Sequence, residues 1–290
     1  MRRLILIDFS WLYNRYYYVA SYNAAMSSEK ANIEESLERM LLQFLSLVKK
    51  SYPHSKVMLA LDPSTSTLKN KTIYDGYKQN RDKESKKEVY RYLVYVIKRI
   101  SAELDPKVFY FVREKGYEAD QLLAYMVKKF HKNHEIIIYS GDKDLLQLSS
   151  YPNTFIADKF EKGHFLIKTD ADIFQKFKNT KGEDFSRISK NKRDILKYRS
   201  LKGDPSDNLE AVFPRIKDKE IAEVIKNYWI DNQEEELSEE RIDCILEDLE
   251  GDNPSLAEKL RNNKDIWLRN YKIMDLLHVD EMEMKRLIWK

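Results

Sequence analysis

The sequence predicts an α/β fold in which a mostly parallel sheet carries helices on both faces and an α-helical C-terminal part follows. In the first half of the chain, short apolar runs alternate with longer stretches that have a helical period. The short runs are almost continuously apolar, which is typical of strands buried on both faces of a parallel sheet. Beyond residue 169 the remaining patterns are helical. These observations divide the chain into residues 1–169 and residues 170–290.

Brief runs rich in β-branched and aromatic residues predict the buried strands. They occupy residues 4–7, 57–61, 108–112 and 136–139. Two further runs, at residues 154–157 and 165–168, are separated by a turn region that contains Lys and Gly. This pair predicts a small hairpin at one edge of the sheet.

The helices are predicted from apolar residues that recur with a period of about 3.6. Leu37, Leu41, Leu45 and Val48 show this period, and it predicts helices over residues 33–48, 89–104 and 122–130. In the C-terminal part the predicted helices cover residues 170–178, 191–201, 218–229, 238–249, 255–262, 266–277 and 280–288.

Composition excludes several classes of protein. Hydrophobic residues make up 42% of the 290 residues, which is enough for a buried core, and charged residues at 34% exceed the usual ~25%. The single cysteine, Cys244, excludes an internal disulfide framework and a cysteine zinc site, and it favours a reducing compartment. The apolar run at residues 4–7 is too short for a secretion signal or a membrane helix, so we expect a cytoplasmic protein with no membrane partner.

Acidic side chains follow the predicted strands at their carboxyl ends, where open α/β sheets bind ligands. The set is Asp8, Asp62, Glu118, Asp120, Asp142 and Asp144, with Asp204 and Asp207 in a later acidic loop. Any one of them could instead be an ordinary helix cap. If they converge, however, two carboxylates about 4 Å apart repel by about 4 kcal/mol at an effective dielectric constant of 20. Oxygen ligands without His or Cys favour Mg²⁺ or Mn²⁺ as the compensating charge.

Basic and aromatic residues are interleaved after the second strand. Lys69, Lys71, Tyr77 and Lys83 belong to this segment, which runs over residues 69–99, and a second basic run covers residues 187–202. Lys and Arg neutralise phosphates, and Tyr rings can stack on unpaired bases, so the segment is a candidate nucleic-acid contact. The alternative is a solvated amphipathic helix, and the second run could equally be a solvated helix face.

Five motifs in one order resemble the 5′-nuclease (flap endonuclease) family, and most closely its phage branch, to which the ribonuclease H of T-even phages belongs. The motifs are Ile7-Asp8-Phe9-Ser10, Tyr77-Lys78-Gln79-Asn80-Arg81 after Asp62, Tyr117-Glu118-Ala119-Asp120, Ser140-Gly141-Asp142-Lys143-Asp144 and Lys202-Gly203-Asp204-Pro205-Ser206-Asp207-Asn208. Each motif is weak alone, but the ordered set spans residues 4 to about 230 and is specific to the family.

The resemblance implies a PIN-like nuclease core over residues 1–169 with a helical arch near residues 63–100. It also implies a helix-turn-helix-type DNA-binding element near residues 203–229. Two Mg²⁺ ions, for which Mn²⁺ can substitute, would be bound. Asp8, Asp62, Glu118 and Asp120 would surround one ion, and Asp142, Asp144, Asp204 and Asp207 the other. Lys78 and Arg81 would contact the scissile phosphate as catalytic cations, and Arg15 the nearby nucleic-acid backbone.

The chain departs from the family pattern at two places. The family often has a second Asp after Glu-Ala-Asp, where this chain has Gln121, so a neutral residue would replace one metal ligand. The family's hairpin after Asp-Asn is often rich in Gly, whereas residues 212–219 contain none, which weighs against the K⁺ site associated with that hairpin. Duplex binding would then depend on Arg215, Lys217 and Lys219.

The implied function is a 5′→3′ exonuclease and structure-specific flap endonuclease that acts near 5′ ends of DNA or RNA–DNA and removes RNA primers during replication. Its partners would be nucleic acids with a 5′ flap, nick or 5′ end and replication proteins such as a sliding clamp or a single-strand-binding protein. We expect a monomer, in the host cytoplasm for a phage-encoded protein. A non-catalytic DNA-binding protein on the same fold and a PIN-type ribonuclease remain alternatives. A phosphotransferase is disfavoured because the chain lacks a Gly-rich phosphate-binding motif.

Overall fold

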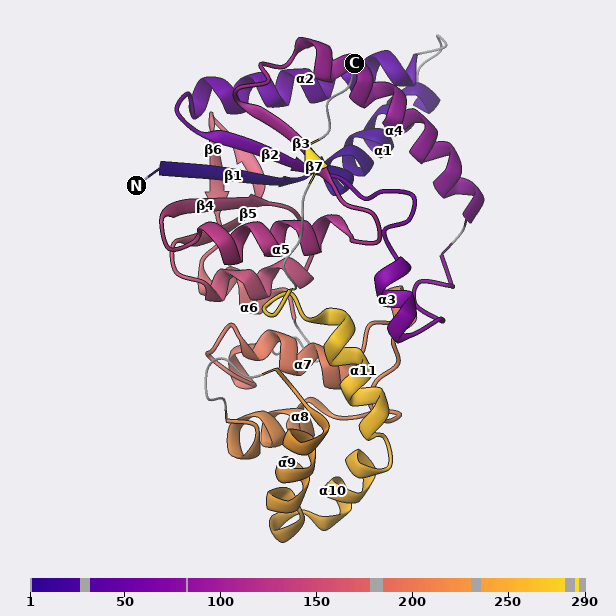
Figure 1. The fold of residues 1–290 in the computed structure, drawn as a ribbon, viewed down its shortest axis with the longest axis vertical. Coiled ribbons are helices and arrows are strands. Elements are labelled where there is room, and N and C mark those ends of the chain that lie inside the picture. Colours follow the sequence, from indigo (N-terminus) through magenta and orange to yellow (C-terminus); the bar gives the residue numbers. More distant parts are fainter. Residues whose placement is uncertain are drawn as a thin grey trace.

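The computed structural model describes residues 2–26, 32–81, 83–177, 185–230, 236–279 and 285–286. In these residues a sheet has the strand order β6-β5-β4-β1-β2-β3-β7 (Figure 1). The strands are β1 (Arg2–Asp8), β2 (Lys56–Ala60), β3 (Phe109–Arg113), β4 (His134–Tyr139), β5 (Thr154–Glu161), β6 (His164–Ile167) and β7 (Lys285–Arg286). The five central strands are parallel, and β6 and β7 pair antiparallel at the two edges. The predicted strands and the edge hairpin are therefore confirmed.

Helices cover both faces of this sheet because β1 directs alternate side chains into two separate cores. Ile5 and Ile7 pack into the core beneath α1 (Phe9–Met26), α2 (Ile33–Ser51) and α4 (Lys83–Glu103). Figure 1 shows these three helices on one side of the sheet. Leu4 and Leu6 pack on the opposite face, under α5 (Ala119–Phe130). The near-continuous apolar strands had predicted this arrangement.

The C-terminal part is helical, as predicted, and shares the second core with α5. Its helices are α6 (Asp170–Gln175), α7 (Asp194–Lys202), α8 (Asp218–Glu223), α9 (Glu239–Asp252), α10 (Pro254–Arg261) and α11 (Lys264–Met274). The fully buried Trp267 of α11 packs against Trp229, which lies just beyond α8. One apolar cluster therefore extends from the sheet into the helical part. Figure 1 shows this part below the sheet, with α3 (Leu68–Ile73) beside α11.

Some of the described elements differ from the predictions. The helix predicted over residues 218–229 ends at Glu223, and a π-helical turn (Val224–Tyr228) follows it. A 3-10 helix (Asp144–Ser150) was not predicted. The helices α1 and α3 were not predicted, because neither has a clear apolar period. The helix predicted over residues 280–288 is wrong in the part that the structure describes, since Lys285–Arg286 form strand β7 against β3. The other residues of that range lie outside the described chain, as does the end of the helix predicted over residues 170–178. The strand β7 depends on a partner strand distant in sequence, which local periodicity does not report.

The predicted arch over residues 63–100 is partly core. Leu93, Val96, Ile97 and Ile100 of α4 are buried against α1 and α2. For the rest of that range, the arch that the resemblance implies stays a prediction. Among the described helices, none is long and apolar enough to cross a membrane.

Candidate active site

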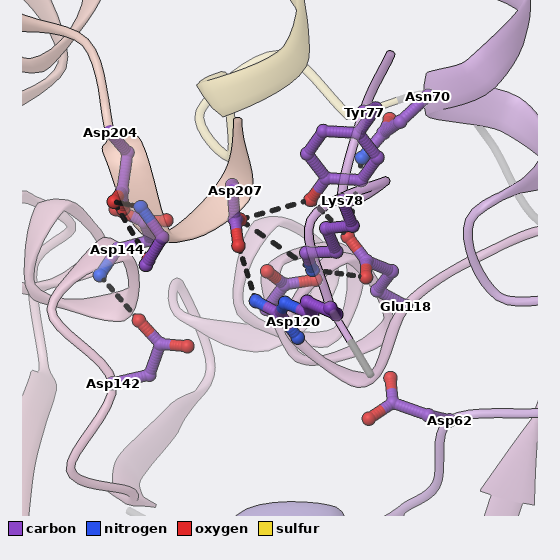
Figure 2. Close-up of polar contacts among 12 residues, drawn as sticks. Asp62, Asn70, Tyr77, Lys78, Glu118, Asp120, Asp142, Asp144, Asp204 and Asp207 are labelled. Carbon is purple, nitrogen blue, oxygen red and sulfur yellow. Dashed lines mark hydrogen bonds and ion pairs between the residues drawn. The ribbon is translucent and has the colours of Figure 1, made fainter. Parts of the chain in front are cut away.

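The acidic residues meet at the carboxyl edge of the parallel strands. Asp8 is the last residue of β1, Asp62 follows β2, and Asp142 and Asp144 follow β4. Glu118 caps the start of α5. The remaining members of the set come from the start of α5 and from the loop after α7: they are Asp120, Asp204 and Asp207. Parallel strands end at the same edge, so the fold brings these side chains together. Figure 2 shows the set apart from Asp8, whose charged neighbours are Asp62 and Asp142.

Asp8 is buried and its carboxylate is fixed at both oxygens. The backbone amide of Trp11 donates to Oδ1 at 2.9 Å, and the hydroxyl of Ser140 donates to Oδ2 at 2.9 Å. Burial, followed by repulsion from the Asp62 carboxylate, raises the pKa of Asp8 to about 7. Gly141, next to Ser140, leaves room for the side chain of Trp11, because a Cβ atom at position 141 would lie 2.7 Å from its ring.

Asp62 is fixed from two directions. Its backbone amide donates to Oγ of Ser10 at 2.9 Å, and its Oδ1 accepts from the amide of Ala119 at 2.7 Å. Burial and then the neighbouring Glu118 carboxylate raise the pKa of Asp62. The Asp62 carboxylate therefore joins the carboxyl end of β2 to the start of α5.

Glu118 and Asp207 are paired with cations and a phenol from the segment between α3 and α4. Lys78 forms an ion pair with Glu118 and lies 3.6 Å from Oδ2 of Asp207. Arg81 forms an ion pair with Oδ1 of Asp207. The hydroxyl of Tyr77 donates to Oε2 of Glu118 at 2.7 Å and lies 3.3 Å from Oδ2 of Asp207. Lys78 is itself largely buried, and these carboxylates outweigh its desolvation and raise its pKa.

Arg199 bridges the other side of the pocket. Its Nη2 lies 2.5 Å from Oδ1 of Asp144 and 2.7 Å from Oδ2 of Asp204. Burial still raises the pKa of Asp144 to about 7, although Arg199 opposes the change. For Asp204, burial is outweighed by Arg199 and by hydrogen bonds from Ser206, which together lower its pKa. Figure 2 shows the Asp144 and Asp204 side chains on one side of the pocket and Glu118 and Lys78 on the other.

Hydrogen bonds fasten the Tyr77–Arg81 segment to the acidic loop. The amide of Lys78 donates to the carbonyl oxygen of Asp207 at 2.9 Å. The side-chain amides of Asn80 and Asn208 donate to the carbonyl oxygens of Pro205 and Gly76 at 2.9 and 2.7 Å. Lys78 and Asn208 both adopt positive φ values, 54° and 60°, which are uncommon for residues other than Gly. The surrounding contacts hold this strained backbone in place.

Gly203 allows the acidic loop to close on itself. Its φ is +73°, and a Cβ atom there would lie 2.5 Å from the backbone of Glu210. The amide of Asp204 donates to the carbonyl oxygen of Leu209 at 2.8 Å across this closure. Any residue with a side chain at position 203 would therefore push the loop open.

The donor set fits a hard divalent cation. Asp144, Asp204 and Asp207 offer carboxylate oxygens that lie within 4.8 Å of one another. Asp120, which neighbours Glu118 and Lys78, has its pKa raised well above the ordinary value, first by burial and then by the Glu118 charge. The pKa of this carboxyl is raised although Lys78 opposes the change, so the cations of the chain do not fully offset burial and the neighbouring acids. Oxygen ligands suit Mg²⁺ or Mn²⁺ as the further positive charge. These carboxylates could therefore hold metal ions.

The predicted nucleic-acid residues have different surroundings. Lys69 and Lys71 lie on α3, and Lys69 is stacked over the ring of Tyr117 at 4.9 Å. Arg15 is exposed on α1 and donates to the carbonyl oxygen of Asp158 at 3.0 Å. Arg215, Lys217 and Lys219 are exposed before and at the start of α8. The side chain of Lys83 lies outside the described part of the chain. The helix-turn-helix element near residues 203–229 also stays a prediction.

Two interpretations require correction. Tyr77 is only 3% exposed and its hydroxyl is bound to carboxylates, so its ring is not available to stack on a base. The side chain of Gln121 does not take the place of a metal ligand, because both ends of its amide group have other partners. Its Oε1 accepts from the amide of Glu118 at 3.0 Å, and its Nε2 lies 3.4 Å from Oδ1 of Asn70, so it caps α5.

Several polar residues of the pocket were not predicted. The sequence places Arg199 only within a basic run. It assigns no individual role to Ser140, Asn70, Asn80 or Asn208. Ser140, Asn80 and Asn208 stand inside the motifs that carry the resemblance, so their position was the available clue. For Arg199 the only clue was its place one turn before Gly203 at the end of a predicted helix.

Comparisons with known proteins agree with this geometry. Residues 3–178 match the family described as 5′-3′ exonuclease, N-terminal resolvase-like domain. A 5′-3′ exonuclease of Mycoplasma genitalium is 28% identical over 216 residues, which cover 73% of this chain and 68% of that protein. The ribonuclease H of Enterobacteria phage T4 is 28% identical over 209 residues, which cover 68% of each chain.

Solved structures show the same fold at lower identity. The bacteriophage T5 flap endonuclease, in a pseudo-enzyme-product complex with DNA and metal ions, aligns with a TM-score of 0.62 at 17% identity and covers 95% of this chain and 90% of its own. The T5 5′-exonuclease with zinc ions bound aligns with a TM-score of 0.63 at 16% identity, with the same coverage of both chains.

Proposed function

The chain belongs to the 5′-3′ exonuclease family, and from this premise we propose that it shortens DNA and RNA–DNA strands from their 5′ ends and cleaves 5′ flaps, with two Mg²⁺ ions bound in the acid pocket. One observation carries the proposal. Eight carboxylates from five separate stretches of chain gather at one sheet edge, together with the cations Lys78, Arg81 and Arg199. An ordinary set of helix caps would not converge in this way.

The residues of the chain would divide the chemical work. Lys78 and Arg81 are held by ion pairs with Glu118 and Asp207, where they can offset the charge that develops on a phosphate. Asp8 is oriented by Ser140 and Trp11, so its carboxylate is preorganised rather than free to rotate. Bound at these carboxylates, divalent cations would supply Lewis acidity at the scissile phosphate and lower the pKa of the attacking water.

The metal grouping follows from the positions of the acids. We assign Asp8, Asp62, Glu118 and Asp120 to one ion and Asp142, Asp144, Asp204 and Asp207 to the other. The short separation of the Asp144, Asp204 and Asp207 oxygens supports the second group. The electrostatic influence of Asp62 on Asp8, and of Glu118 on Asp120, supports the first.

Basic residues outside the pocket would hold the substrate. Arg15, Lys69 and Lys71 lie on the two helices that flank the carboxyl edge, α1 and α3. We assign Arg215, Lys217 and Lys219 to duplex phosphates, because they are exposed on the helical part. We also assign Lys83 to nucleic acid, on the sequence alone. The relative that forms a complex with DNA shares this fold.

The test is cleavage of a 5′-labelled flap substrate with MgCl₂ and with EDTA. We expect short 5′-labelled products and flap-length products with Mg²⁺ and none with EDTA. A second substrate with an RNA-tipped 5′ strand tests primer removal, and single-stranded RNA tests the PIN-type ribonuclease alternative. Tight flap binding without cleavage in Mg²⁺ or Mn²⁺ would instead establish a non-catalytic DNA-binding protein.

The cellular setting is part of the same proposal. We infer a monomer that acts in the cytoplasm beside replication proteins, such as a sliding clamp or a single-strand-binding protein. The single cysteine, which suits a reducing compartment, supports this placement. Sedimentation of the full chain alone measures whether it is a monomer. Sedimentation with each candidate partner measures whether the two bind.

A further inference from the structure

Arg199 occupies carboxylate oxygens that a divalent cation would need. Its Nη2 lies 2.5 Å from Oδ1 of Asp144 and 2.7 Å from Oδ2 of Asp204, so a single nitrogen bridges two acids. These acids, with Asp207, form the group whose oxygens lie within 4.8 Å of one another. A metal ion in that group would draw its oxygen ligands from the two carboxylates that Arg199 already contacts.

This ion pair leaves polar atoms unsatisfied. The Arg199 side chain is only 13% exposed, and its Nε has no hydrogen-bond partner among the described residues. Oδ1 of Asp144 meets the guanidinium closely but without the geometry of a hydrogen bond. A buried guanidinium usually satisfies more of its five N–H donors, because unpaired buried donors are costly. The arrangement therefore balances charge without completing a hydrogen-bond network.

The acidic loop has anchors other than the Arg199 side chain. The side-chain amide of Asn270, which is fully buried on α11, donates to the carbonyl oxygens of Ser200 and Glu210 at 3.1 and 2.8 Å. These two bonds clamp the loop at both ends. The closure between Asp204 and Leu209 holds it in the middle.

We propose that Arg199 is an internal counter-ion that competes with the divalent cation for Asp144 and Asp204 and thereby weakens metal binding at this end of the pocket. The proposal rests on the proposed function, since it assumes that the pocket binds divalent cations. Arg199 is a positioning residue here, because it acts through the two carboxylates. In the metal-free protein it offsets their repulsion, and it must withdraw from them when a cation binds.

A purely structural bridge would have the opposite effect. If Arg199 served only to hold Asp144 and Asp204 together, its removal would let them separate and metal binding would weaken. If Arg199 competes with the metal, its removal leaves two carboxylates without compensation and metal binding tightens. The direction of the change in affinity therefore distinguishes the two roles without any measurement of cleavage.

The experiment is a titration of the full chain with MnCl₂, without nucleic acid, in which electron paramagnetic resonance measures free Mn²⁺. For Arg199→Gln we expect tighter binding by about tenfold, which corresponds to about 1.4 kcal/mol. The matched control is Lys202→Gln. It removes the same charge from the same helix, but Lys202 pairs with Asp218 at 2.7 Å, outside the acid group. Solvent screening should keep its affinity within about twofold of the wild-type value.

A second readout is thermal unfolding in EDTA and in MnCl₂. Arg199→Gln should melt lower than the wild type in EDTA, because two buried acids lose their counter-ion. Mn²⁺ should raise its melting temperature by more than it raises that of the wild type, because a tighter ligand stabilises the folded state more.

Unchanged or weaker Mn²⁺ affinity in Arg199→Gln would overturn the proposal. If that variant does not fold, Arg199→Lys decides: we expect a smaller tightening, since Lys cannot present a guanidinium, and equal or weaker affinity overturns the proposal. A wild type that binds no Mn²⁺ would contradict the proposed function. In that event, binding gained by Arg199→Gln would still support the counter-ion role, and its absence would overturn that role too.

Discussion

The backbone amide of Lys78 donates a 2.9 Å hydrogen bond to the carbonyl oxygen of Asp207, which joins the segment that carries Lys78 and Arg81 to the loop that carries two of the acids. The amides of Asn80 and Asn208 add one bond each across the same seam. Displacement of either segment would therefore move both the cations and the acids. The first prediction tests this linkage.

Asn208→Ala should destabilise the protein by about 1–3 kcal/mol, because it loses the bond to Gly76 and places Ala at a φ of 60°. Asn208→Gly should cost less, since Gly adopts this backbone freely. Urea unfolding measures both. Asn153→Ala is the matched control: Asn153 has a φ of 59°, and its amide also donates to a carbonyl oxygen, but away from the pocket. Asn208→Ala should also lower the single-turnover cleavage rate, whereas the control Asn153→Ala should not.

Lys78→Ala should lower the single-turnover rate at saturating Mg²⁺ by about 10²–10³-fold, the usual effect of removing one preorganised donor at a developing charge. The control is Lys71→Ala, which removes a charge from α3. This variant should weaken flap binding and leave the rate at saturating enzyme unchanged. An unchanged rate in Lys78→Ala would exclude the role of Lys78 at the phosphate.

Asp8→Asn and Asp142→Asn should each reduce cleavage by more than about 100-fold, since each removes a charged oxygen ligand from a metal position. Flap affinity measured in EDTA should stay near the wild-type value, because the basic residues are untouched. Asp105→Asn is the control, as Asp105 pairs with Lys49 at 3.3 Å on the surface. Near-normal turnover in either pocket variant would contradict the two-metal assignment.

Without divalent cations, stability should fall as pH rises between about 4 and 7. Burial first, and acidic neighbours, raise the pKa values of Asp8 and Asp144 from 3.8 to about 7, so the folded state binds these protons more tightly than the unfolded state. Raising the pH through this window removes that advantage, at about 1.4 kcal/mol for each pKa unit. Thermal unfolding in EDTA at pH 5 and pH 8 measures the change.

Asp8→Asn is the control for the pH experiment, because it removes one of the acids whose pKa is raised. Its melting temperature should depend less on pH than that of the wild type. Mn²⁺ at pH 8 should restore stability in the wild type, because a cation can replace the proton. A wild-type melting temperature that rises from pH 5 to pH 8 in EDTA would show that these acids are not desolvated in the metal-free protein.

Tyr77→Phe should cost about 1–3 kcal/mol in urea unfolding, since the buried Glu118 carboxylate loses a donor. Tyr22→Phe is the control, as Tyr22 is 63% exposed, and it should leave the stability unchanged. Full stability in Tyr77→Phe would contradict a stabilising hydrogen bond from Tyr77 to Glu118.

The sequence by itself determined the parallel strands, both helical layers and the eight acids. Strands such as residues 4–7 and 136–139 are apolar on both faces, and that composition can be buried only inside a covered sheet. The acids could be found because parallel strands bring their carboxyl ends to one edge of the sheet. Residues that directly follow such strands are therefore expected to lie close together. The family motifs then indicated the chemistry.

The tertiary structure alone decided how the acids are balanced. Arg199, Lys78 and Arg81 contact carboxylates that lie far from them in the chain or across a loop, and no local pattern encodes those contacts. The predictions for Tyr77 and Gln121 were wrong for the same reason. The hydroxyl of Tyr77 donates to the Glu118 carboxylate, and the side chain of Gln121 caps a helix, because of the residues that the fold packs against them. Periodicity reports the face on which a residue lies, whereas charge pairing depends on neighbours that only folding supplies.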